Sequence, residues 1–297
     1  AFLLRKKSPI LELTLWSLVL IRFVLPPDLS QPLSIRNLVD IKLLESSAMG
    51  FESPDIAISG GAFSFNDKGG EPAQLTAVPR WMILTLYLWA GGVALFSLLF
   101  FLRRRKWSVL ANRALPVDDE LMLRQLKLFK VRLRVRRNVK LRMSPNVQSP
   151  FTIGVLRPVI VFPSALFSEK AGTVITSAMA HELVHIKRFD DLRLVAQNII
   201  QIVFFFHPAI WLANHFIYIA RECVCDSVAI TAGKLSPQSY GFSLLASLKS
   251  PAGPHAAVLP AFTSPASAAK RRILFIKKGY VMKRHIIYKF SLLLIAV

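Results

Sequence analysis

Residues 180–190 read Ala-His-Glu-Leu-Val-His-Ile-Lys-Arg-Phe-Asp, and this stretch contains two histidines and a glutamate at the spacing of a metal-binding helix. His181 and His185 are four residues apart, so on a helix both imidazoles leave the same face and can meet at one tetrahedral cation. Glu182 lies beside them, where its carboxylate can reach a water molecule on that cation. The pattern predicts a zinc site with Glu182 as the catalytic acid/base. Two histidines without a ligand on an exposed helix face are the alternative.

The third zinc ligand has to come from elsewhere in the chain, because two histidines leave the site incomplete. Glu222 is our candidate, 37 residues after His185 (222 minus 185). This distance allows one helix to leave, turn at His207-Pro208 and bring a second helix back antiparallel. Asp226 lies one helical turn beyond Glu222, where it can accept a hydrogen bond from the non-ligating nitrogen of a zinc-bound histidine, His181 in our interpretation. For both acids, surface charges on an amphipathic helix are the alternative.

Several other residues near the second helix can contribute to this chemistry. Three of them can donate a hydrogen bond to a tetrahedral reaction intermediate, and each also has a structural interpretation: His207, His215 and Arg221. Cys223 and Cys225 are the only cysteines, so a disulfide framework is excluded and a reducing compartment is expected. Their spacing suits joint chelation poorly, and we interpret them as small core residues.

The composition indicates that part of the chain lies in a bilayer. Hydrophobic residues make up 53% of the 297, too many for two ordinary soluble domains. We expect membrane spans, with short flanks, at 1–27, 81–102 and 284–297. The second has no internal charge and stops at a run of four basic residues, 103–106, whereas Glu12 and Arg22 interrupt the first. The chain begins at Ala1 and stops inside the third apolar run, so we expect both ends to be truncated.

The distribution of charge predicts the orientation of these spans. The loop 28–80 carries seven acidic residues and few basic ones, so we place it outside the cell. Basic residues flank the apolar spans on the opposite side, as the positive-inside rule requires, and residues 103–283 are therefore expected to be a cytoplasmic domain. A net charge of +21 also raises nucleic acid as a partner, but that alternative does not explain why the cations flank apolar spans. We expect contact with membrane lipid and no direct nucleic-acid binding.

Within residues 103–283 the periodicity predicts an α+β domain. Helices are expected from 118 to about 134, from a cap at Ser168 to about Arg188, at 191–206, and from Pro208 to about 233. Residues 139–143 and 158–163 are predicted strands joined by 150–154, and the strand 158–163 is expected to offer its edge to an extended peptide. The stretch 250–269, rich in Pro, Ala and Ser, indicates a linker or lid.

The order of these motifs resembles a known family. The segments are Ser-Pro-Phe-Thr-Ile-Gly (149–154), Pro-Val-Ile-Val-Phe-Pro (158–163), the 180–190 stretch, His-Pro-Ala-Ile-Trp (207–211) and Arg-Glu-Cys-Val-Cys-Asp (221–226). From about residue 11 onward the chain is similar to the BlaR/MecR-type antirepressor sensor metallopeptidases, which are integral-membrane gluzincins. The resemblance implies a multi-span helical membrane protein with a cytoplasmic gluzincin domain. It also implies His181, His185 and Glu222 as zinc ligands and Glu182 as the acid/base, with His207 where the family has Asn.

These observations predict a membrane-anchored, zinc-dependent endopeptidase with a protein or peptide substrate. The leading hypothesis is signal transduction, in which the enzyme cleaves a cytoplasmic regulator, such as a transcriptional repressor, or itself. A housekeeping protease that removes damaged membrane proteins is one alternative. A receptor or scaffold without catalysis is the other, and it would not need Glu182. A site inside the membrane is disfavoured because Lys187, Arg188 and two aspartates follow the motif directly.

Overall fold

The structure is a computed structural model of residues 1–297, and it describes residues 9–24, 79–168, 172–247 and 265–278. Contacts between Cα atoms divide the chain into two units. One unit joins residues 1–24 to residues 88–297, and it contains the elements discussed below. The other comprises residues 25–87, of which the described part is 79–87, the beginning of one long helix.

This long helix, α3 (Arg80–Arg113), contains the predicted second span. Its most apolar window has a mean hydropathy of 2.0 and none of that window is buried. Among the described residues, α3 is the one helix that is long and apolar enough to cross a bilayer. The predicted first span is helical as α1 (Pro9–Val24), which packs on α8 through Leu13 and Leu20. The predicted loop 28–80, apart from its last two residues, and the predicted third span, 284–297, lie outside the described residues.

A small mixed sheet follows α3. Its strands are β1 (Leu115–Pro116), β2 (Lys140–Ser144), β3 (Phe151–Ile153) and β4 (Val159–Pro163), in the order β1-β2-β4-β3. Strands β2 and β4 are parallel, whereas the β1–β2 and β3–β4 pairs are antiparallel. Two expectations were wrong here. Residues 151–153 were expected to be a connection, but they form strand β3. Strand β4 was expected to offer its edge to a peptide, but it lies between β2 and β3, so the edge of the sheet on that side is β3.

The remaining elements are helical, in agreement with a mostly helical α+β domain. Helix α4 (Glu120–Leu133) begins where Asp119 accepts hydrogen bonds from two backbone amides of its first turn. The others are α5 (Ala165–Ser168), α6 (Gly172–Arg188), α7 (Asp190–Val203), α8 (Pro208–Gly233), α9 (Pro237–Ser247) and α10 (Pro265–Lys277). Ser168 ends α5, so it does not cap α6 as expected. Residues 265–269, expected to be part of a linker, begin α10, and 250–264 lie outside the described residues.

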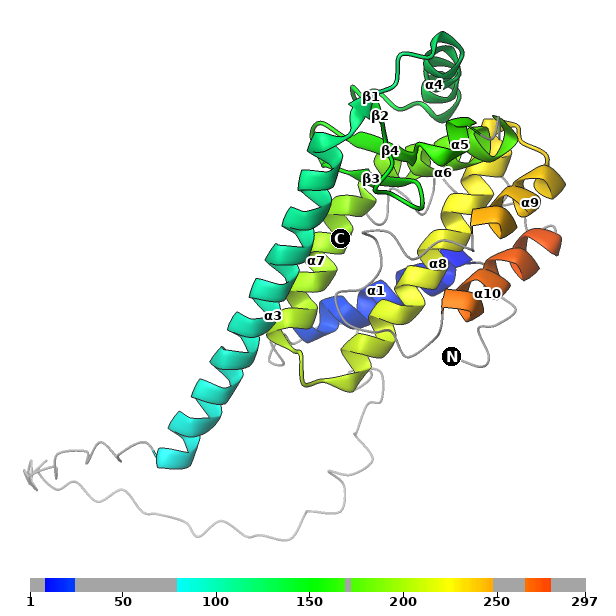
Figure 1. The fold of residues 1–297 in the computed structure, drawn as a ribbon. Coiled ribbons are helices and arrows are strands. Elements are labelled where there is room, and N and C mark those ends of the chain that lie inside the picture. Colours follow the sequence, from blue (N-terminus) through cyan, green and yellow to red (C-terminus); the bar gives the residue numbers. More distant parts are fainter. Residues whose placement is uncertain (1–8, 25–78, 169–171, 248–264, 279–297) are drawn as a thin grey trace, which may run out of the picture. The chain divides into compact units, whose positions relative to one another are not determined.

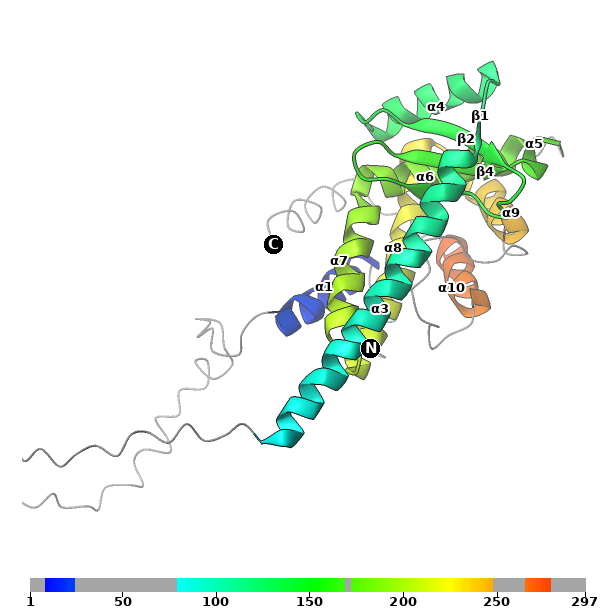
Figure 2. The ribbon, with the colours of Figure 1, turned by 60° about the vertical axis from the view of Figure 1, so that its left-hand side comes forward.

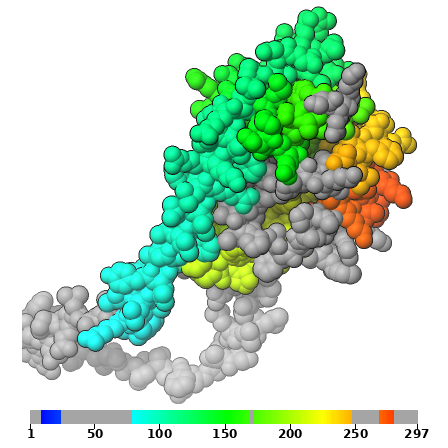
Figure 3. Space-filling view, viewed as in Figure 1, coloured from blue at the N-terminus to red at the C-terminus, as the bar shows by residue number. Residues whose placement is uncertain are grey.

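The core lies between α6, α8 and the sheet. Met179 and Leu183 of α6, Val224 of α8 and Phe162 of β4 are all 0% exposed and belong to one cluster. Burial of each such side chain contributes about 1.5–3 kcal/mol to folding, so the contact between α6 and α8 is strongly favoured. Helix α7 runs beside the middle of α3 (Figures 1 and 2), where Trp89 donates to the Val203 carbonyl and Arg104 to Asp191. Helices α9 and α10 are neighbours at the surface (Figure 3).

Candidate metal centre

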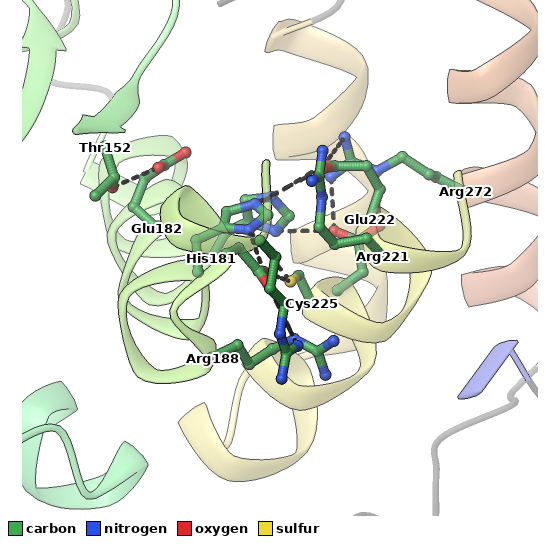
Figure 4. Close-up of polar contacts among 12 residues, drawn as sticks. Thr152, His181, Glu182, Arg188, Arg221, Glu222, Cys225 and Arg272 are labelled. Carbon is green, nitrogen blue, oxygen red and sulfur yellow. Dashed lines mark hydrogen bonds and ion pairs between the residues drawn. The ribbon is translucent and has the colours of Figure 1, made fainter. Parts of the chain in front are cut away.

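The structure brings three buried donor groups together, two on α6 and one on α8 (Figure 4). The Nε2 atoms of His181 and His185 are 3.0 Å apart. The Glu222 carboxylate lies 3.4 Å from His181 Nε2 through Oε2 and 3.7 Å from His185 Nε2 through Oε1. In tetrahedral zinc sites, bonds of about 2.0–2.1 Å separate neighbouring donors by about 3.3 Å. The three separations therefore match three corners of a zinc tetrahedron, and the fourth corner is left for a water molecule or a substrate.

The other ring nitrogen of each histidine has an acidic partner. His185 Nδ1 lies 2.8 Å from Asp190 Oδ2. His181 Nδ1 lies 3.1 Å from Asp226 Oδ1 and 2.9 Å from the Tyr240 hydroxyl, which itself donates to Asp226 at 2.7 Å. Because carboxylates only accept hydrogen bonds, both Nδ1 atoms carry hydrogen and both Nε2 atoms point toward Glu222. This orientation is the one that a metal ion requires.

The charges of these groups favour a cation among them. Burial alone lowers the pKa of His181, but its hydrogen bonds with Asp226 and Glu222 outweigh this effect and raise the pKa to about 10. Burial would raise the pKa of Glu222, yet the Arg272 guanidinium and the hydrogen bond with His181 hold it well below its usual range. Without a metal, His181 is therefore protonated, and its Nε2 proton lies among the three donor atoms that would bind the ion. Zinc can replace that proton, and the donor set fits the ion.

The catalytic candidate Glu182 is buried next to His181 on α6 and points toward the sheet. Its Oε2 atom accepts a hydrogen bond of 2.7 Å from the hydroxyl of Thr152, which lies on the edge strand β3 (Figure 4). One acid side chain thus joins the helix that carries both histidines to the strand at the sheet edge. The hydrogen bond fixes the direction of the carboxylate.

Comparison with known proteins agrees with this arrangement of groups. The model of the BlaR1 peptidase M56 family matches residues 2–276. The chain belongs to this family. It is 29% identical over 159 residues to the regulatory protein BlaR1 of Bacillus licheniformis, covering 53% of this chain and 26% of that protein. It is 23% identical over 206 residues to BlaR1 of Staphylococcus aureus, covering 69% and 34%.

A third relative is the methicillin resistance mecR1 protein of Staphylococcus epidermidis, 21% identical over 167 residues, which cover 56% of this chain and 28% of that protein. In each pair the alignment spans about a third of the relative's length or less. The resemblance to the BlaR/MecR-type peptidases stated from the motifs is confirmed. Family membership supports a peptidase, and the roles of the individual residues rest on the geometry described above.

Two residues of this M56 site were given no role from the sequence. Asp190, the partner of His185, is the first residue of α7. From the sequence it was recognised only as the last residue of the 180–190 motif. Phe189 adopts a left-handed conformation (φ 56°) between α6 and α7, and this turn returns Asp190 toward the histidine. Burial raises the pKa of Asp190, but the charge of Arg188 and the hydrogen bond with His185 outweigh burial and lower it. The signal in the sequence was an acid directly after the end of the motif helix.

Arg272 of α10 is the second residue that was missed. Its Nε and one terminal nitrogen each donate to Asp226 at 2.7 Å, and its other terminal nitrogen lies 3.2 Å from Glu222 Oε2 (Figure 4). The basic run 270–272 was the available signal, but it directly follows a stretch expected to be a linker or lid. Burial alone would raise the pKa of Asp226. The charge of Arg272 outweighs burial, so the pKa lies below its usual value.

The three predicted hydrogen-bond donors lie at different distances from the site. Arg221 is adjacent, with Nε 3.8 Å from Glu222 Oε1. His215 is seven residues before Glu222 on the same helix, a rise of about 10 Å. His207 is fifteen residues before Glu222, about 22 Å along the axis, where it caps α8 and packs its ring against Phe23. The structure does not bring His207 to the donor atoms.

Cys223 and Cys225 are both free and buried, as expected of core residues. The Cys225 sulfur lies 3.4 Å from His185 Nδ1 and 3.4 Å from Asp190 Oδ2. Burial and the charge of Asp190 raise the thiol pKa well above its usual range, so the group stays protonated. A protonated thiol donates to Asp190 and supports the partner of His185.

Proposed function

We propose that this chain is a membrane-anchored zinc endopeptidase that transduces a signal by cleaving a cytoplasmic regulator or itself. The observation that carries the proposal is the set of three donor atoms at tetrahedral spacing, with both outer nitrogens held by acids and Glu182 beside them. Zinc, when bound, supplies the Lewis acidity that peptide hydrolysis needs. A receptor without catalysis would need neither Glu182 nor its partner Thr152.

Glu182 moves the protons in this mechanism. Its carboxylate takes a proton from the attacking water and returns it to the leaving amine. The Thr152 hydroxyl, 2.7 Å from Oε2, keeps the carboxylate in one direction while both transfers occur. Asp190 holds the ring of His185, and Asp226 with Tyr240 holds the ring of His181. Arg221 is the donor best placed to stabilise an oxyanion, because it lies beside Glu222.

We further propose that the substrate pairs with β3, the edge strand next to Glu182. The contact between Thr152 and Glu182 supports this placement, because it sets the strand beside the acid/base. Phe151, Thr152 and Ile153 are 1%, 3% and 8% exposed, so neighbouring segments must move apart before a peptide can bind. Peptides with N-methylated backbone amides on alternate residues should then be cleaved poorly. Equal cleavage of methylated and unmodified peptides would argue against strand pairing.

Helix α3 is proposed to anchor the enzyme, with residues 103–283 on the cytoplasmic side. Its exposed apolar window and the basic run 103–106 at the end of that window support both statements. Orientation can be tested by labelling single introduced cysteines in intact cells with an impermeant reagent. Labelling at position 124 without permeabilisation would place the domain outside.

The experiment that tests the catalytic proposal combines metal analysis with a peptidase assay on the full chain. We expect about one zinc ion per chain in the wild type, and loss of cleavage but not of zinc in Glu182→Gln. The matched control is Glu120→Gln, which changes an exposed acid paired with Arg124 at 2.6 Å. The proposal fails if the wild type binds no zinc, or if Glu182→Gln cleaves as fast as the control.

A further inference from the structure

Two adjacent arginines of α10 reach in different directions. Arg272 contacts Asp226 and Glu222 of α8 through three nitrogens, at 2.7, 2.7 and 3.2 Å. Arg271 donates to Glu12, which lies on α1. Consecutive residues on a helix point about 100° apart, so one turn of α10 can bridge two neighbouring helices. The pair therefore connects α1 to the candidate metal centre.

Arg272 determines the direction of two carboxylates at once. Its planar fork holds both oxygens of Asp226, one of which lies 3.1 Å from His181 Nδ1. Its remaining nitrogen contacts the Glu222 oxygen that lies 3.4 Å from His181 Nε2. A lysine would keep the charge but could not reproduce these contacts, because its ammonium is a point charge without the fixed fork.

Glu12 is an unusual residue for the face on which it lies. It is 8% exposed, and it is the one charged residue among the buried residues of this helix, which are otherwise apolar apart from Thr14. A buried carboxylate is retained when a cation pairs with it, and Arg271 is that cation. The pair fixes where α10 lies relative to α1, and so fixes how far the next residue, Arg272, extends over α8. Helix α1 itself packs extensively on α8, so the three helices form one contact group.

We propose that Arg272 is a positioning residue for the zinc ligands, and that Glu12 controls its placement through Arg271. A change in the position of α1 then changes the orientation of the Glu222 and Asp226 carboxylates at the metal centre. This inference rests on the proposed zinc peptidase function. It adds a route by which a helix outside the catalytic motifs sets the geometry of those ligands.

The test uses the full chain in detergent micelles and two readouts that do not depend on turnover. The first is zinc affinity, measured by competition with a chromophoric chelator. The second is the visible absorption spectrum of the Co²⁺-substituted protein, which reports the coordination geometry. The variants are Arg272→Ala, Arg272→Lys, Glu12→Gln and the double variant Glu12→Gln/Arg272→Ala. Controls are Glu120→Gln and Arg124→Ala, which alter an exposed pair.

Arg272→Ala should weaken zinc binding by roughly 10- to 100-fold, the usual effect of losing a partner of a metal ligand, and should shift the Co²⁺ bands. Arg272→Lys should lie between this variant and the wild type. Glu12→Gln should change both readouts in the same direction and by less. The double variant should match Arg272→Ala alone, because Glu12 acts through the arginine.

Wild-type affinity and spectrum in Arg272→Ala would overturn the positioning role, and additive losses in the double variant would overturn the control by Glu12. If Arg272→Ala does not fold, Arg272→Lys decides the role of Arg272, since wild-type affinity and bands in that variant would equally overturn it. Glu12→Gln/Arg272→Lys then replaces the double variant. Failure of the proposed zinc peptidase function gives a different result. The wild type itself would then bind no metal, or its peptidase activity would not depend on Glu182.

Discussion

Replacing Asp191 should loosen the attachment of α3 to the edge strand β3. Arg104, just after the apolar part of α3, donates to both carboxylate oxygens of Asp191 at 2.8 and 2.7 Å. The same carboxylate accepts from the backbone amide of Gly154 at 3.1 Å, directly after β3. One side chain of α7 therefore joins α3 to the strand that carries Thr152. Asp191→Ala removes all of these contacts together.

The size of the effect follows from the exposure of the pair. The side chain of Arg104 is 31% exposed and that of Asp191 is 9% exposed, so water screens part of the attraction. A two-pronged pair of this kind contributes about 1–2 kcal/mol, above the usual range for exposed pairs. The lost bond to the Gly154 amide adds about 1 kcal/mol. A loss of about 2–3 kcal/mol should lower the melting temperature by about 4–12 °C.

The assay is a thermal melt in detergent for Asp191→Ala, Arg104→Ala and the double variant, with peptidase rates measured in parallel. The coupling free energy of the pair should be about 1–2 kcal/mol. The same cycle on Glu120 and Arg124, exposed by 76% and 70%, should give no more than about 0.5 kcal/mol. Equal coupling in both cycles would refute the reasoning. Cleavage should also slow in Asp191→Ala, because β3 holds the partner of Glu182.

Four further predictions concern the centre itself. Thr152→Val should lower kcat about tenfold, the equivalent of one hydrogen bond to a charged group, while zinc affinity measured by chelator competition stays unchanged. Tyr240→Phe should weaken zinc binding about tenfold by the same measurement, since the hydroxyl lies 2.9 Å from His181 Nδ1. The His181 pKa is about 10 in the metal-free protein, so zinc must displace a proton and its affinity should rise about tenfold per pH unit up to about pH 10. The stability that protonated His181 gives the metal-free protein is complete below its unfolded pKa of about 6.5 and is lost as the pH rises through 10, which pH-dependent melts can detect.

The parts of the fold set by local sequence patterns could be predicted. The start and the end of α8 followed from Pro208 and Gly233, and the start of α4 followed from the acids at 118–120. Strand β3 could not be recognised, because three residues are too few for an alternating pattern to stand out. The mistaken edge assignment has a related cause. Whether β4 lies inside a sheet depends on its pairing with β2 and β3, which periodicity along one strand does not encode.

The candidate site divides in the same way. His181, Glu182 and His185 are close because of helical spacing, so the sequence alone places them together. Glu222 needed one assumption, an antiparallel return of the chain, and α8 makes that return. Arg272 lies 46 residues beyond Asp226, and its contact depends on where α10 packs. His207 was selected because it is near Glu222 in the sequence, but a straight helix carries it about 22 Å away.

A common design connects the acids around the centre. Asp226 is held by Arg272 of α10, Asp190 lies beside Arg188 of α6, and Asp191 is held by Arg104 of α3. Each pair joins two different helices, and the Arg272 and Arg104 contacts are 2.7–2.8 Å long. A relative shift of about 1 Å would carry such a contact beyond hydrogen-bond distance. Because Asp226 and Asp190 orient His181 and His185, the proposed zinc ligands are sensitive to small movements of the helices that supply the arginines. A peptidase built this way can be switched by moving a helix, without any change in the ligands themselves.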